Sequence, residues 1–74
     1  MVVFDVLNLI REDIKVGIFK FSDGNIITLR AYDSEKDSLI TEISEDQLGY
    51  YLHQEVKNIM APAKDVIVLA VLGV

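Results

Sequence analysis

The sequence predicts a small α+β domain, in which helices pack on one face of an antiparallel sheet of three or four strands. Three observations lead to this fold class: an Asp-Gly pair between two apolar runs, an amphipathic stripe after Ser44, and an uninterrupted apolar run over Val66–Leu72. The expected element order is α-β-β-β-α-β. A chain of 74 residues has material for one hydrophobic core, so we expect a single domain over residues 1–74.

The first expected element is a helix over Val2–Glu12. Polar residues in this stretch recur at helical spacing on one side, and apolar residues recur on the other. The β-branched residues at its start favour the alternative, a strand over Val2–Leu7.

A β-hairpin is expected over Ile14–Tyr32. Asp23-Gly24 suits a two-residue type I′ turn, which would place Ile18 opposite Leu29. One face of this hairpin is apolar and belongs on the core. The other face should be polar if it were solvated, yet it is half aromatic. That second face carries Phe19, Phe21, Ile26 and Tyr32 beside Lys15 and Arg30.

A third strand is expected over Ser38–Ile43, after a polar connection over Asp33–Asp37. A second helix over Ser44–Met60 should follow, because Ser44 and Gln47 have the spacing of a capping box and an apolar stripe follows them. Pro62 should end this helix, since the residue before a proline avoids the helical region.

The C-terminal segment Asp65–Val74 is expected to be a strand buried on both faces, with a helix as the alternative. After the second helix, this strand would lie parallel to the third strand through a right-handed crossover. It must be interior in the sheet or paired across a subunit interface, because an exposed apolar edge would aggregate.

The net charge of −5 is concentrated between Asp33 and Asp46, where six acids and one base lie, while the rest of the chain is neutral. Such an acidic surface argues against direct nucleic-acid binding, which needs clustered Lys and Arg. The acidic surface consists of Asp33, Glu35, Asp37, Glu42, Glu45 and Asp46.

The order helix, three strands, helix resembles that of the double-stranded-RNA-binding domain. Those domains begin the second helix with a lysine cluster that grips phosphates. This chain has Glu45 and Asp46 at the corresponding place. The resemblance is therefore limited to the order of the elements and does not imply RNA binding.

The sequence indicates no catalytic residue, metal site or cofactor. Cysteine is absent, so a thiolate site is excluded, and the four glycines stand apart and form no phosphate loop. His53 is the one histidine and is interpreted as a solvated helix residue. The carboxylates over Asp33–Asp37 lack the glycine and glutamate spacing of a calcium loop. Glu55 falls within the expected apolar stripe, and Lys20 is its expected partner.

We therefore expect a non-enzymatic protein-interaction module that is homodimeric and cytoplasmic, with no targeting signal or membrane segment. More than half of the residues are apolar, and one small core cannot easily hide them. Docking should use the aromatic sheet face and the C-terminal strand. The alternative is an acidic inhibitor of the phage type, which would mimic phosphates in the basic groove of a nucleic-acid-binding protein. The expected partner-binding residues are Phe19, Phe21, Ile26, Arg30, Tyr32 and Tyr50.

Overall fold

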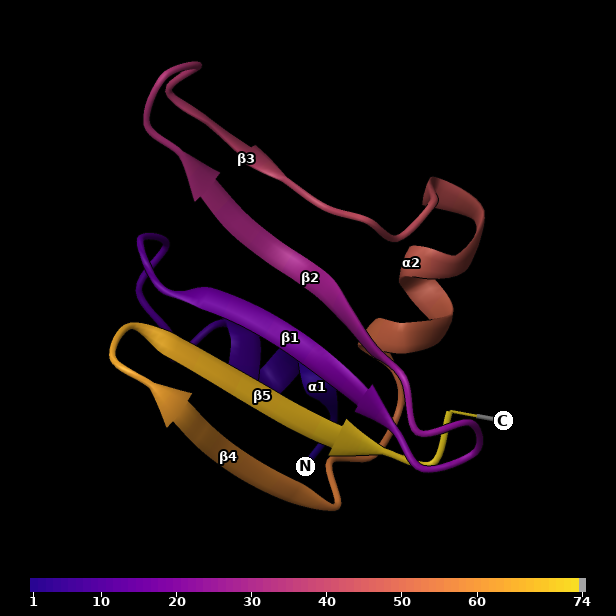
Figure 1. Ribbon diagram of the computed structural model, residues 1–74. Helices are drawn as coiled ribbons and strands as arrows, with labels where there is room; N and C mark the ends of the chain where they lie inside the picture. The colour runs from indigo at the N-terminus through magenta and orange to yellow at the C-terminus, as the bar shows by residue number, and fades with distance from the viewer. Residues whose placement is uncertain (74) are drawn as a thin grey trace.

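A five-stranded mixed sheet and two helices form the structure, a computed structural model that describes residues 1–73 (Figure 1). The α+β class is thus confirmed, although the sheet has more strands than expected and is not wholly antiparallel. Across the sheet the strand order is β3-β2-β1-β5-β4. The elements in chain order are α1 (Val3–Leu7), β1 (Lys15–Lys20), β2 (Ile26–Asp33), β3 (Ser38–Ile40), α2 (Glu45–Leu52), β4 (Asn58–Ala63) and β5 (Val66–Val71).

β5 is an interior strand, as its unbroken apolar sequence predicts. Leu69 and Ala70 are fully buried, and they point to opposite faces of the sheet. The expected neighbour is wrong, however. β5 runs parallel to β1, from Lys15 opposite Val66 to Lys20 opposite Val71, and it does not touch β3. The crossover that makes this pair parallel therefore contains β2, β3, α2 and β4, so it is much longer than a single helix.

The predicted helix over Ser44–Met60 is wrong in its second half, because α2 ends at Leu52. The chain then pairs with the N-terminus, where the N–H of Val56 donates to the carbonyl of Met1 at 2.9 Å. Residues 58–63 form β4, an edge strand antiparallel to β5. Pro62 is compatible with this position, since an edge strand has amides that need no partner within the sheet.

Both helices are short. α1 covers only Val3–Leu7, which is the first half of the predicted helix, and the Asp5 carboxylate accepts a hydrogen bond from the Val2 N–H at 3.3 Å. Ser44 is the N-cap of α2 as expected, but the capping box does not form, because the Ser44 side chain makes no capping hydrogen bond. The Ser44 carbonyl instead accepts from the N–H groups of Gln47 and Leu48.

The β1–β2 hairpin is present, but its loop is longer than predicted. Ile18 lies opposite Ile27 and not opposite Leu29, so the register differs by two residues from the expected one. The N–H of Gly24 donates to the carbonyl of Lys20, and Gly24 takes up the positive φ of 73° that the turn requires. Because side chains alternate with period two, a two-residue shift leaves each of them on its predicted face.

A β-bulge breaks this alternation in β2. Gly17 lies opposite Thr28 while Val16 lies opposite Arg30, so Leu29 is an extra residue in β2. Arg30 consequently lies on the helix side, where its Nη2 donates to the carbonyls of Ile10 and Arg11 at 3.0 and 3.1 Å. The prediction that Arg30 shares a face with Phe19 is therefore wrong.

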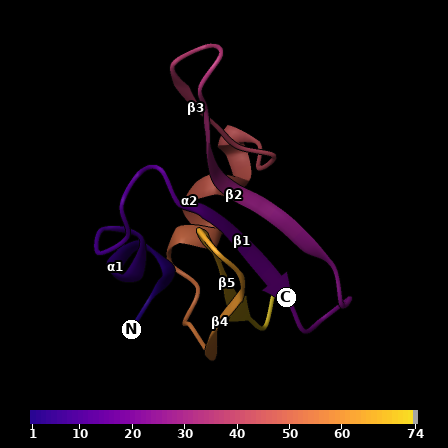
Figure 2. The same cartoon turned by 60° about the vertical axis from the view of Figure 1, so that its left-hand side comes forward.

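The hydrophobic core lies between the sheet and the two helices. Figures 1 and 2 show α1 and α2 on the same side of the sheet, as the sequence predicts. The buried residues that β1 and β5 contribute to the cluster lie at alternate positions, which is the periodicity of one sheet face, and β2 contributes Leu29. The buried members of this core are Val3, Val6, Val16, Ile18, Leu29, Ile43, Tyr51, Leu69 and Val71.

No helix within residues 1–73 is both long enough and apolar enough to cross a membrane.

The turn between β4 and β5 contains Asp65, which has a φ of 61°. A left-handed conformation of this kind disfavours side chains that branch at Cβ.

The Asp65 conformation gives a first testable prediction. Asp65→Val should lower the free energy of unfolding by about 1 kcal/mol, because a side chain that branches at Cβ is more strained in the left-handed region than aspartate is. Asp65→Gly is the matched control and should match or exceed the wild type. Urea unfolding at one fixed protein concentration measures both variants. Equal stability of the valine and glycine variants would contradict the role of this φ.

Candidate functional site

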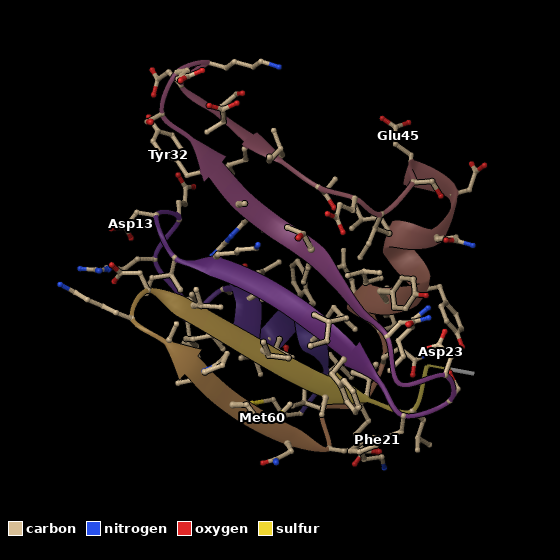
Figure 3. All side chains as sticks on the ribbon, in the orientation of Figure 1. Asp13, Phe21, Asp23, Tyr32, Glu45 and Met60 are labelled. Carbon is tan, nitrogen blue, oxygen red and sulfur yellow. The ribbon has the colours of Figure 1, made fainter. Side chains whose placement is uncertain are left out.

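The side of the sheet that faces away from the helices is apolar, and no segment of residues 1–73 covers it (Figure 3). Phe21 and Ile26 are 55% and 61% exposed there. Phe19 lies opposite Ile26 and packs edge-on against Phe21 with ring centroids 5.2 Å apart. We call this surface the open face; it consists of Phe19, Phe21, Ile26, Met60, Val66 and Val68.

Gly17 leaves the centre of the open face without a side chain on β1. A Cβ at Gly17 would lie 3.3 Å from Cγ2 of Ile26 and 3.6 Å from Cγ2 of Val68. Side chains from β2 and β5 therefore flank this stretch of β1 backbone, and Val68 is only 5% exposed although no helix covers it. On the far side of β5, Met60 of β4 lies opposite Val68 and continues the apolar surface.

The open face has one basic residue at its border. Lys15 begins β1 on the same side as Phe19 by strand alternation, opposite Val66 of β5. Its side chain is exposed and makes no ion pair with any carboxylate in the described part of the chain.

Three of the six residues predicted to bind a partner lie together on the open face, and three do not. Arg30 points to the helix side because of the bulge. Tyr32 lies at the far end of β2 from Phe21 (Figure 3), where its hydroxyl donates to the Asp37 carboxylate. This hydrogen bond raises the pKa of Tyr32. Tyr50 is on α2, edge-on against Tyr51, and is 46% exposed.

The two edges of the sheet are poor templates for a further strand. β3 has only three residues. β4 is irregular between Met60 and Ala63 and contains Pro62, which has no N–H to donate. Short, bulged and proline-containing edges of this kind oppose edge-to-edge association.

Several carboxylates of the acidic surface make hydrogen bonds within the protein. Glu42 accepts from the Thr28 N–H at 2.9 Å, and its own N–H donates to the Thr28 carbonyl at 3.0 Å, so it satisfies the edge of β2 just beyond β3. Asp33 accepts from the N–H groups of Glu35 and Lys36 in the β2–β3 turn. These bonds fix the carboxylates in local structure and reduce their freedom to meet an external cation.

The remaining acids do not form one surface with those of the turn. Glu45 and Asp46 occupy the first turn of α2, where negative charge favours a helix. Figure 3 shows Glu45 at one end of β3 and Tyr32, beside the acidic turn, at the other. The acidic surface is therefore split into two clusters, although it is continuous in sequence.

The loop of the β1–β2 hairpin contains the best-formed ion pair of the described chain. Nζ of Lys20 lies 2.9 Å from Oδ2 of Asp23, and the Asn25 N–H donates to Oδ1 of Asp23 at 2.9 Å. The pKa of Asp23 is lowered, mainly by the hydrogen bond from the Asn25 N–H and next by the one from Lys20. The hydrogen bond to Asp23 in turn raises the pKa of Lys20. Lys20 is thus not the partner of Glu55, as the sequence suggested.

The residues considered for catalysis or metal binding lie apart. Glu55 is exposed, because α2 ends before it, and it pairs with Lys57 at 3.4 Å. His53 follows α2 and is exposed, with Nδ1 2.7 Å from the Gly49 carbonyl oxygen. Within residues 1–73, no three histidine or acidic side chains come close enough together to hold a metal ion.

Comparison with known proteins adds no relative. No protein-family model, no curated protein and no solved structure matches the chain. The open face is therefore interpreted from its own geometry.

The contribution of β4 to the open face was not predicted from the sequence. Met60 lies on this surface only because residues 58–63 form a strand, and the helical stripe after Ser44 concealed that strand. Pro62 does not distinguish the two readings, since a helix that ends before it and a strand edge both tolerate a proline there.

The Lys20–Asp23 pair predicts a pH dependence of stability. The pKa of Asp23 is lower in the folded state than its ordinary value of 3.8, so the folded protein holds the ionised form more strongly than the unfolded chain. The stabilisation should be complete above this ordinary value and should be lost as the pH falls through the folded-state pKa. Asp23→Asn keeps an acceptor for Asn25 but removes the charge.

Thermal unfolding from pH 7 to pH 2 would test this prediction. The midpoint of the wild type should exceed that of Asp23→Asn at pH 7, and the difference should shrink steadily below about pH 4. A difference that does not change with pH would show that the charge of Asp23 contributes nothing to folding.

Proposed function

We propose that this protein is a non-enzymatic protein-interaction module that forms a homodimer by stacking the open faces of two copies. The observation that supports this proposal is the contrast between the two sides of the sheet. One side is covered by both helices, whereas the other exposes Phe21 and Ile26 by more than half of their surface. The free energy falls when a second apolar surface removes an apolar sheet face from water.

The dimensions of the open face suit a weak dimer. Three strands of six residues and one of eight make a face about 20 Å long and about 15–20 Å wide. Two such faces packed together would bury on the order of 1,000 Å² in total, which is near the lower limit for a specific interface. Stacked sheets pack about 10 Å apart, with strands either nearly aligned or nearly perpendicular. We therefore expect a dimer with a dissociation constant in the micromolar range.

The arrangement of the sheet favours stacking over edge pairing. β5, which was expected to dock as a strand, is enclosed between β1 and β4 and has no free edge. Its contribution to docking is the half-buried side chain of Val66 on the open face, because Val68 is already only 5% exposed in the single chain. The edge strands β3 and β4 are too short or too irregular to extend the sheet into a second copy.

The open face also supports association better than the acidic surface supports phosphate mimicry. A mimic of nucleic-acid phosphates needs carboxylates that are free to meet cations in a row. Here Asp33 and Glu42 accept hydrogen bonds from the protein's own backbone, and Glu45 lies apart from the acidic turn.

Sedimentation velocity over a range of concentrations would test the dimer. The wild type should shift from the 8.3 kDa chain to twice that mass as its concentration rises through the micromolar range. Phe21→Asp with Ile26→Glu should weaken association by at least tenfold, because each charge would have to be desolvated in the interface. Both positions are exposed, so the double variant should still fold.

Phe4→Asp is the matched control. Phe4 is 49% exposed on α1, on the helix side of the sheet, and an acid suits the first turn of a helix. This variant should associate like the wild type. The proposal fails if the wild type stays at 8.3 kDa at every concentration, or if Phe4→Asp disrupts the dimer as strongly as the open-face double variant.

A further inference from the structure

A second apolar surface lies on the helix side, as a groove of about 210 Å³. It is bounded by α1, by α2 and by the β2–β3 hairpin, which extends beyond the rest of the sheet (Figure 1). One wall includes Leu39 of β3, which lies opposite Tyr32 and is 46% exposed, and the floor includes Leu29, the extra residue of the bulge. The groove is lined by Leu7, Leu29, Arg30, Leu39, Ile40, Thr41, Leu48 and Leu52.

Arg30 is the one charged residue in the lining of this groove. Its side chain is partly buried, and its Nη2 donates to two backbone carbonyls near the end of α1. Neither acceptor carries a charge, and Arg30 forms no ion pair with a carboxylate of residues 1–73. Its Nε is buried and has no hydrogen-bond acceptor among the described residues.

A partly buried guanidinium without an anionic partner, as at Arg30, is energetically unfavourable. Guanidinium groups withdrawn from water are normally paired with an anion, and a buried donor without an acceptor is destabilising. The other polar group in the lining, the Thr41 hydroxyl, already donates to the Thr28 carbonyl. The groove therefore combines apolar walls with one cation whose charge is not balanced, and its complement is an apolar molecule with one negative group.

The size of the groove limits the ligand. An apolar cavity of about 150 Å³ can hold benzene, whereas sites for drug-sized ligands have about 300 Å³ or more. A volume of about 210 Å³ suits a single alkyl chain of about eight carbons with a small head group.

We propose that this groove binds a medium-chain alkyl carboxylate, with its chain along the leucines of α1, α2 and β3 and its carboxylate at the guanidinium of Arg30. The carboxylate accepts charge-assisted hydrogen bonds from the guanidinium, and the chain covers the exposed side chain of Leu39. Ligands of this size reach dissociation constants on the order of 100 µM. The groove and the open face lie on opposite sides of the sheet, so this binding does not depend on the proposed dimer.

A chemical-shift titration of the full chain with sodium octanoate tests this inference. Saturable shifts should appear at the amides of Leu39, Leu48 and Leu52, and not at the open face. Octan-1-ol is the matched neutral probe, because it has the same chain and no charge. It should bind about tenfold more weakly, since it cannot form the charge-assisted pair.

Two variants separate the role of the charge from the role of the fold. Arg30→Met should make octanoate and octanol bind equally, provided that the variant folds without the hydrogen bonds to Ile10 and Arg11. Leu39→Glu places a negative charge on the exposed wall of the groove and should weaken octanoate binding about tenfold or more. Leu9→Glu is its control, because Leu9 is 78% exposed and does not line the groove.

Three results would overturn the proposal. The first is octanol binding as tightly as octanoate, and the second is Leu39→Glu binding octanoate as well as Leu9→Glu does. The third is an absence of saturable shifts in the groove with octanoate. If an apolar peptide saturates the groove and octanoate does not, the groove is a site for a protein partner. A failed dimer test would leave these results unaffected.

Discussion

The parallel pairing of β1 with β5 is the interaction on which the rest of the structure depends. It joins residues about fifty positions apart in sequence, from Lys15 opposite Val66 to Lys20 opposite Val71. Val16, Ile18, Leu69 and Val71 are fully buried on its helix side. The helices cannot supply this core themselves, because helices of five and eight residues are marginal without tertiary packing. Folding of α1 and α2 therefore follows from closure of the β1–β5 pair.

The same pair explains why one side of the sheet stays open. All of the helical material is required on the side where Val3, Val6 and Tyr51 close the core. A five-stranded sheet has two faces, and this helical material covers only one of them. On the uncovered side, Val68 of β5 is only 5% exposed, and it lies beside the place where a Cβ at Gly17 would stand. β5 is apolar on both faces because it lies inside the sheet. The helices cover only one of these faces, so the other face becomes part of an apolar surface.

Sequence patterns located the parts of this fold that depend on local chemistry. The hairpin, the N-cap at Ser44 and the apolar strand over residues 66–71 were predicted correctly, because turn residues, capping residues and apolar runs are local signals. The open face was predicted through Phe19, Phe21 and Ile26, whose alternation survived a two-residue error in register. β4 and the partner of β5 depend on long-range pairing, for which the sequence between Leu52 and Pro62 has no local marker.

The bulge at Leu29 has the largest effect on the two surfaces for which binding is proposed, and it is the feature least accessible to pattern analysis. One additional residue in β2 moves Arg30 from the open face to the groove. With regular alternation, Arg30 would stand on the same side as Phe19, and two such faces could stack only by burying two like charges. The bulge instead leaves the open face with one base, Lys15, at its border, and gives the groove its cation. A single irregularity in one strand therefore decides which surface suits an apolar partner and which suits an anion.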